Sequence, residues 1–288
     1  MTLSLQADRA TEDIPLSARD LDRWVPGVLD GINILAGGAN VIMQLSWPGV
    51  GHGVKDSKVE SGSLFKHPFK RTRTTLTYLA VATMGTAAEK AAYAAAVNRV
   101  HAQVRSEPGA AVSYSAMDPN LQLWVAACLY RGFVDAVAAF RGETSAGRGE
   151  DFHARAAGLG TMLQVRPGIW PKDIAAFDAY WAAGLAAARI DPATRDFLGA
   201  LADLRFLPAP LPLLFGRFNR FMTTGFLPPE LRTAMGLPWD ERRQRRFERV
   251  ARRLGTLNAL LPRVLRQAPF LLVLRDFRRR LRTGAPLV

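Results

Sequence analysis

The stretch AAEKAAYAAAVNRVHAQV, residues 87–104, decides the fold class of this chain. Alanine has the highest helix propensity of all residues, so a long helix is expected here. The surrounding segments repeat apolar residues at spacings of three and four, and strand-like alternation is almost absent. The sequence therefore predicts an all-α protein. The expected helices span residues 22–38, 74–84, 87–104, 121–140, 170–190, 192–204, 230–235, 240–259 and 262–281.

Capping residues and glycines mark the expected helix boundaries. Asp118-Pro119 and Asp191-Pro192 each place an acceptor side chain before a proline, which is typical of a helix start. Gly37-Gly38 follows helix-like sequence, and we interpret this pair as a helix C-terminus. Loops are expected at residues 46–67, 106–113, 142–151 and 206–215. The first loop is long and rich in glycine, so it is a candidate lid or entrance.

Length and composition favour one domain. The chain has 288 residues, 49% of them hydrophobic, which is ample for one large core. We divide it into an N-terminal segment (1–25), a main helical region (26–240) and basic C-terminal helices (241–288) packed on the same domain. The most apolar run, beginning at Leu207, is broken by three prolines and cannot span a membrane as a helix. With a single cysteine and no secretory signal, these features predict a cytoplasmic protein.

Positive charge is concentrated in the last third of the chain. Residues 201–288 contain 18 arginines, no lysine and 6 acidic residues, a net charge of +12 out of +13 for the whole chain. This pattern fits a solvated arginine-rich helix face, and it also fits peripheral contact with an anionic membrane surface. Zinc-finger, RNP and helix-turn-helix patterns are absent, so no nucleic-acid partner is expected.

His101 is the candidate metal ligand. A histidine on an apolar helix can bind a metal or a haem iron through its neutral ring, although such a residue is more often packed in the core. Arg71 and Thr75 are four residues apart, as are His101 and Arg105 on the next expected helix, so each pair shares a helix face. Two consecutive helices can bring all four side chains together. The alanines near His101 leave room for a flat macrocycle, and they equally fit close helix packing.

Other chemistries find little support in the sequence. HExxH, phosphate-loop and Gly-x-Ser-x-Gly patterns do not occur. Cys128 lies in an apolar run and is expected to be a buried small hydrophobe. Asp118 is interpreted as a helix cap. The remaining histidines, His52, His67 and His153, are expected at the surface.

Several spaced segments together resemble the MpaB-type oxygenases, also called the DUF2236 family, which includes the latex clearing protein rubber oxygenases. Their order and spacing over roughly residues 30–240 carry the resemblance. The matching pieces are Gly37 to Val50, Gly53-Val54, Pro68 with Arg71 and Thr75, His101 with Val104-Arg105, Tyr114 to Ala116 with Asp118-Pro119, Trp124-Val125, Trp170-Pro171, Phe177, Tyr180-Trp181, Leu227-Pro228, Leu231-Arg232 and Gly236-Leu237.

This resemblance implies a non-covalent b-type haem in an all-helical fold. His101 falls on the proximal iron ligand, Arg71 and Thr75 on the family's Arg-x-x-x-Thr positions, and Arg105 on the arginine one turn after the ligand. Thr75 would donate a hydrogen bond in the pocket, whose walls would come from residues 44–47 and the helix after Thr75. Asp56 is the nearest match to the glutamate that serves as a base in rubber-cleaving members.

The chain departs from its relatives at two positions. Thr74 stands where the rubber-cleaving members have a lysine that can reach the iron, so lysine gating is not expected. Ala126 stands where many relatives have a histidine.

The function implied is that of a haem-dependent oxygenase acting with O2 on an apolar organic substrate, such as a terpenoid or a polyketide. In this interpretation Arg71 and Thr75 are the catalytic residues of the pocket. The alternative is a haem- or ligand-binding helical protein without turnover, associated with a membrane surface through its basic C-terminal helices.

Overall fold

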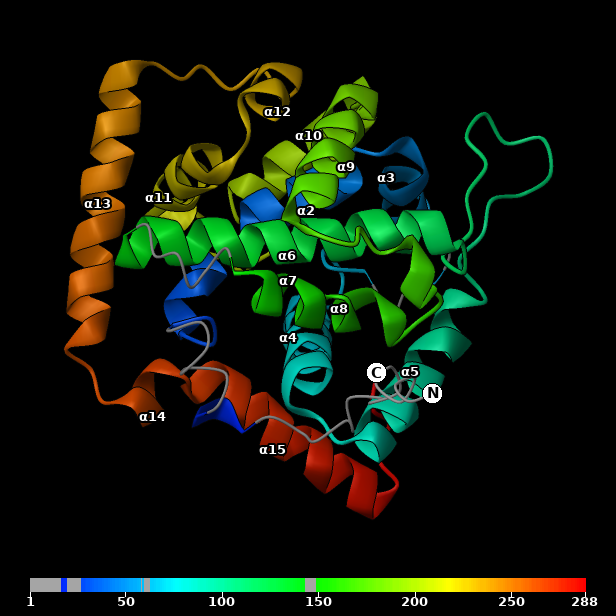
Figure 1. Ribbon diagram of the computed structural model, residues 1–288. Helices are drawn as coiled ribbons and strands as arrows, with labels where there is room; N and C mark the ends of the chain where they lie inside the picture. Colours follow the sequence, from blue (N-terminus) through cyan, green and yellow to red (C-terminus); the bar gives the residue numbers. More distant parts are fainter. Residues whose placement is uncertain (1–16, 20–26, 58, 60–62, 143–148) are drawn as a thin grey trace, which may run out of the picture.

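In the computed structural model, helices surround one long central helix (Figure 1). The structure describes residues 17–19, 27–57, 59, 63–142 and 149–288, and every regular element within them is a helix, which confirms the all-α prediction. Elements marked η are 3-10 helices. The elements are η1 (Gly31–Ala36), α2 (Gly37–Leu45), α3 (Pro48–Lys55), α4 (Pro68–Met84), α5 (Ala87–His101), α6 (Pro119–Arg141), α7 (Glu150–Ala156), α8 (Gly158–Thr161), η4 (Pro167–Ile169), α9 (Ile174–Ala187), α10 (Pro192–Ala202), α11 (Leu211–Phe226), α12 (Pro229–Ala234), α13 (Glu241–Ala259), α14 (Arg263–Arg266) and α15 (Ala268–Thr283).

Helix α6 crosses the middle of the molecule and organises the core. It packs against α2, α8 and α13, while α15 lies against α4 on the opposite side of the fold from α10 to α12 (Figure 1). Most of the buried apolar side chains form one continuous cluster. Helix α6 is also long and apolar enough to cross a membrane, but 67% of its apolar window is buried inside the fold, as in the core helix of a globular protein.

The predicted helix starts are confirmed by their caps. The Asp118 carboxylate accepts hydrogen bonds from the Asn120 and Leu121 backbone N–H groups, at 2.7 and 3.4 Å. The Asp191 carboxylate accepts from the Thr194 N–H at 3.0 Å. These bonds satisfy donors that the first turn of a helix leaves without partners, and they fix where α6 and α10 begin.

Gly37-Gly38 was expected to end a helix; Gly37 does cap the end of the 3-10 helix η1, but the pair also begins α2, so the helical path continues through it. Close packing between two helices explains why residue 38 is glycine. A Cβ atom on Gly38 would lie 2.4 Å from Thr223 Oγ1, so only glycine lets α2 and α11 approach this closely. The expected helix over 22–38 is η1 followed by α2, and its first residues up to 26 lie outside the described residues.

Three of the expected loops contain helices. Helix α3 occupies residues 48–55, α11 begins at Leu211, and α7 begins at Glu150 after a segment outside the described residues. Prolines suggested a loop at 206–215. However, Pro212 lies in the first turn of α11, where a backbone N–H has no helical partner to lose.

Three tryptophans stack at the centre of the molecule. The Trp47 and Trp124 rings lie 4.8 Å apart and nearly parallel, and Trp124 and Trp181 lie 5.1 Å apart. Trp124 Nε1 donates to the Met43 carbonyl at 3.1 Å, and Trp47 Nε1 donates to the Gly184 carbonyl at 3.0 Å. The stack therefore joins the start of α3 to α6 and α9, and the indole N–H groups of Trp47 and Trp124 are satisfied.

A buried carboxylate ties the C-terminal helices to the start of the fold. Asp30 is only 1% exposed, and it accepts hydrogen bonds from Arg266 at 2.7 Å, Asn258 at 2.7 Å and Arg141 at 3.1 Å. These donors come from α6, α13 and α14, so one carboxylate fixes the turn between α13 and α15 on the core.

Gly255 sets the spacing between α13 and α6. A Cβ atom at this position would lie 1.7 Å from the Phe140 carbonyl oxygen, which is rigid backbone. We expect Gly255→Ala to force α13 away from α6 and to lower the free energy of unfolding by about 1–3 kcal/mol, measured by urea denaturation. Gly168→Ala is the matched control because a Cβ there meets nothing within 4 Å. Equal stability of the two variants would contradict this account.

Candidate functional site

An apolar cavity of about 600 Å³ lies between α3, α4, α5, α6, α8 and α10, a size usual for small-molecule and cofactor sites. Its apolar walls include Val50, Leu64, Phe65, Leu121, Val125 and Leu129. Gln44 lines the cavity, as expected, but Trp47 belongs to the tryptophan stack behind it.

The cavity brings together three of the residues singled out in the sequence. Arg71 and Thr75 come from successive turns of α4, and His101 is the last residue of α5. Thr74 also lines the cavity. The helical spacing on α4 explains why Arg71 and Thr75 face the same space.

His101 presents a neutral imidazole to this space. Its Nδ1 atom is buried and has no hydrogen-bond partner. Burial, together with the nearby positive charge of Arg71, lowers the pKa of His101 to about 4. At neutral pH the ring is therefore uncharged, which is the form that binds a metal ion.

Arg71 lines the cavity, and more than a third of its surface is accessible. Burial lowers the pKa of its guanidinium. Arginine nevertheless stays protonated in proteins. Among the described residues no carboxylate pairs with it. A cation without a counter-ion beside an apolar cavity favours a ligand that carries an anionic group.

The hydroxyl groups of Thr74 and Thr75 are both held by the helix itself. Each donates to the Arg71 carbonyl oxygen, at 2.9 and 3.0 Å. A hydroxyl has only one proton to donate, so in this arrangement Thr75 offers the cavity an acceptor. This differs from the donor role expected from the sequence.

Arg105 does not share a helix with His101, and that prediction is wrong. Helix α5 ends at His101, and Arg105 pairs with Ser115 in an isolated antiparallel bridge. The Ala116 N–H donates to the Val104 carbonyl at 2.9 Å, which turns the chain away from the helix axis. Arg105 is exposed and is not among the residues that line the cavity.

Asp56 lies at the C-terminal end of α3 and is not among the lining residues. Its carboxylate accepts from His52 Nδ1 at 2.7 Å and pairs with Lys55 at 3.1 Å. His52 is half-buried on α3 and lies between Asp56 and Asp191. His67 is exposed, as expected.

His153 is 1% exposed, so its predicted surface location is wrong. Trp170 stacks on its ring at 5.5 Å, and Tyr130 and Phe177 pack edge-on against it. These contacts join segments that are distant in the sequence, which is why the histidine alone gave no sign of burial. Cys128 is buried, as expected.

Two tyrosines of the cavity wall were not found from the sequence. Tyr93 on α5 donates its hydroxyl to the Thr74 carbonyl at 2.8 Å, and Tyr78 on α4 donates to the Leu159 carbonyl at 2.5 Å. Burial raises the pKa of Tyr93 to about 12 and also raises that of Tyr78, so both phenols stay protonated. In the sequence, the only indication that these tyrosines line the site was their position on the helices that carry Arg71 and His101.

The end of the described chain also belongs to the wall. Val288 lines the cavity, and the Leu287 carbonyl accepts from Arg73 at 3.4 Å. The basic C-terminal region therefore contributes to the site, which its charge alone did not suggest.

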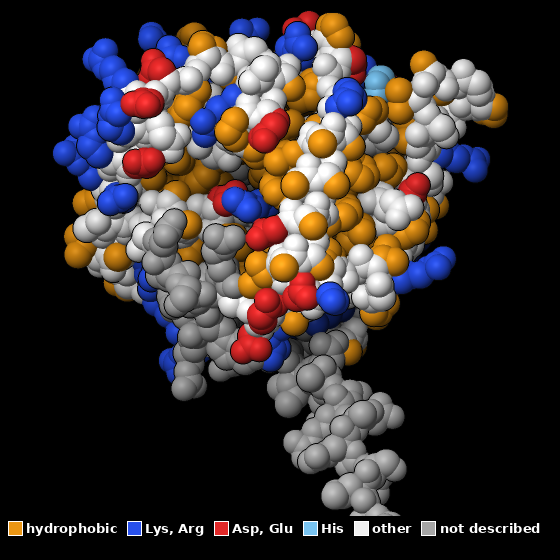
Figure 2. Space-filling view, turned by 45° about the horizontal axis from the view of Figure 1, so that its top comes forward, with side chains coloured by type: hydrophobic (Ala, Val, Ile, Leu, Met, Phe, Trp, Pro, Cys, Tyr) orange, Lys and Arg blue, Asp and Glu red, His pale blue; other side chains and the backbone are white. Residues whose placement is uncertain are grey.

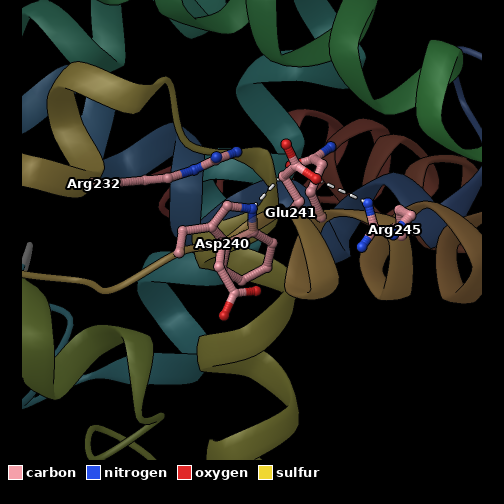
Figure 3. Close-up of a pocket in the computed structure, with 6 residues that line it drawn as sticks. Arg232, Asp240, Glu241 and Arg245 are labelled. Atoms are coloured by element: carbon pink, nitrogen blue, oxygen red, sulfur yellow. Dashed lines mark hydrogen bonds and ion pairs between the residues drawn. The ribbon is translucent and has the colours of Figure 1, made fainter.

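Figure 3 shows a second pocket, at the start of α13. Its polar side chains satisfy one another: Trp239 Nε1 donates to Gln244 at 2.9 Å, and Arg245 pairs with Glu241 at 3.0 Å. The Arg232 guanidinium lies over the Trp239 ring at 5.0 Å. This mutual pairing makes it a weaker candidate than the cavity at His101.

The donor set of the main cavity fits a haem better than a metal held by protein alone. The described residues contain no cluster of three or more His, Cys, Asp or Glu side chains suited to a metal ion. A haem brings four nitrogen ligands of its own and needs one axial side chain, and its propionates need cations. The neutral imidazole of His101 and the unpaired guanidinium of Arg71, which both line the cavity, meet these two needs.

Comparison with known proteins gives the family. The family described as "ER-bound oxygenase mpaB/B'/Rubber oxygenase, catalytic domain" matches residues 26–256. Uncharacterized proteins Mb2261 of Mycobacterium bovis and Rv2237 of Mycobacterium tuberculosis are each 49% identical over 250 residues, covering 87% of this chain and 98% of theirs. No solved structure matches. The chain therefore belongs to the MpaB/rubber oxygenase family and contains its oxygenase catalytic domain.

Proposed function

We propose that this oxygenase depends on haem b and acts with O2 on an apolar organic substrate. One observation carries the proposal: a neutral imidazole and a guanidinium without a counter-ion line the same apolar cavity. His101 would bind the iron, and Arg71 would pair with a propionate. When bound, the haem supplies the iron at which O2 is bound and activated.

The rest of the wall would shape the pocket for an apolar substrate. The aliphatic and aromatic side chains from α3, α6 and α10 exclude water from the reacting groups. Thr75 presents a hydroxyl oxygen that accepts hydrogen bonds, because its proton is used on the Arg71 carbonyl. The phenols of Tyr78 and Tyr93 donate to backbone carbonyls and hold α4 against α8 and α5.

Of the two positions at which the chain departs from its relatives, Thr74 lines the cavity and Ala126 does not. Thr74 lines the cavity and carries no amine at this position, although Lys55 and Lys70 line the cavity elsewhere. Ala126 is buried and is not among the lining residues. The Ala126 Cβ lies 3.2 Å from the place that a Cβ atom would occupy if residue 160 were not glycine. A larger side chain at residue 126 would therefore press on Gly160 of α8, which itself lines the cavity.

Purified protein tests this function directly. Protein expressed with ample haem should show a Soret band, and it should consume O2 when a terpenoid or polyketide substrate is added. Omission of the substrate is the control. A folded, colourless protein would exclude the haem, whereas a Soret band without uptake on any substrate of these classes would favour the haem-binding alternative.

A further inference from the structure

The turn between α13 and α15 exposes a dense group of large aliphatic side chains. Their exposed fractions run from 47% to 77%. Soluble proteins rarely leave apolar side chains of this size together on the surface, so such a group indicates an interaction site. We call it the apolar tip, and it consists of Leu257, Leu260, Leu261, Val264 and Leu265.

The apolar tip is anchored to the core. Asn258, which follows Leu257 of the tip, donates to the buried Asp30 at 2.7 Å, and Arg266, which follows Leu265, donates to the same carboxylate. Gln267 is buried as well. The exposed side chains of the tip therefore lie on a turn between two helices that is fixed to the core.

Arginines surround the tip on both helices that leave it. On α13, Arg249, Arg252 and Arg253 share the exposed face with Leu257 and Leu260 because they fall within one helical stripe. On α15, Arg275 follows the exposed Leu272. Figure 2 shows Lys and Arg side chains gathered along the left edge, where α13 runs.

These arginines are available to an external anion. Among the described residues, no acidic side chain forms an ion pair with Arg252, Arg253 or Arg275. By contrast, Arg278 pairs with Glu89 and Arg280 pairs with Asp276. An apolar tip with a ring of unpaired cations matches the interface of an anionic bilayer, where acyl chains lie beneath charged headgroups.

We propose that the apolar tip inserts into an anionic lipid membrane while Arg252, Arg253 and Arg275 contact its headgroups. A second copy of the chain fits this surface poorly, because a symmetric contact between two tips would bring their arginines together. A nucleic acid would engage the arginines but gives the exposed leucines no apolar partner.

Vesicle sedimentation of the full chain tests the proposal. We expect the protein to pellet with vesicles of phosphatidylcholine and phosphatidylglycerol, and much less with phosphatidylcholine alone. Added salt should weaken the binding. Leu260→Ser/Val264→Ser should lower the partition coefficient at least tenfold, and Arg252→Gln/Arg253→Gln should lower it on anionic vesicles only.

Two matched controls locate the effect. Leu213→Ser/Leu214→Ser removes side chains that are 82% and 65% exposed at the start of α11, and Arg217→Gln/Arg242→Gln removes two exposed charges elsewhere. Both controls should bind like the parent protein. Failure of the parent protein to pellet, unchanged binding of the tip variant, or an equal loss in the α11 variant would overturn the proposal. So would a dimer in gel filtration that the tip variant dissolves.

Discussion

His101→Ala is expected to fold normally and to purify without haem. The imidazole is the one histidine of the described chain that lines the apolar cavity, so its removal leaves the iron without this axial ligand. The change removes an unpartnered ring nitrogen and leaves the helical hydrogen bonds of α5 intact, so we expect little loss of stability. The ratio of Soret to protein absorbance, with the far-ultraviolet circular dichroism spectrum, measures both effects.

His67→Ala is the matched control for this variant. His67 is exposed directly before α4 and is absent from the cavity wall, so its loss should leave the Soret band unchanged. Imidazole added to the His101→Ala protein during haem loading should restore part of the band, because the vacated space can admit the free ligand. A His101→Ala protein that keeps a full complement of haem would rule out His101 as the iron ligand.

Asp30→Ala is expected to cause the largest loss of stability of any single change that we propose. Asp30 is 1% exposed and Arg266 only 12%, so removal of the carboxylate leaves a nearly buried guanidinium without its counter-ion. Breaking a buried pair of this kind costs about 3–5 kcal/mol. Urea denaturation should show a correspondingly lower midpoint.

Glu241→Ala provides the comparison for that loss. Glu241 pairs with Arg245 on the surface, where the two side chains are 89% and 65% exposed, and solvent screens such pairs. We expect Glu241→Ala to lower the urea midpoint by only a small fraction of the shift caused by Asp30→Ala. Similar midpoints for the two variants would show that Asp30 does not anchor the C-terminal helices.

Local rules predicted the fold class and several helix starts. Asp118 and Asp191 cap their helices through bonds to residues two or three positions later, so the information lies within one turn of sequence. Residue 38 must be glycine because Thr223, which is distant in the chain, packs against it, and no local rule could supply that contact. The end of α5 at His101 depends in the same way on the pairing of Val104 with Ala116.

The candidate site was predicted in part. Arg71, Thr75 and His101 were found from helical spacing together with the family resemblance, and the structure brings them to one cavity. Val288 could not be found because its approach to α4 depends on how α15 packs. The hydrogen bonds of Asp30 could not be predicted either, because its partners lie 111 to 236 residues away in the sequence.

The pairing that ends α5 separates His101 from the loop that follows it. The Ser106 N–H donates to the Tyr114 carbonyl at 2.9 Å, and the Ala116 N–H to the Val104 carbonyl at 2.9 Å, so two bonds close the base of residues 107–113. A surface loop closed at its base accommodates added residues at little thermodynamic cost. During evolution this loop is free to lengthen, shorten or acquire new contacts while the imidazole keeps its position.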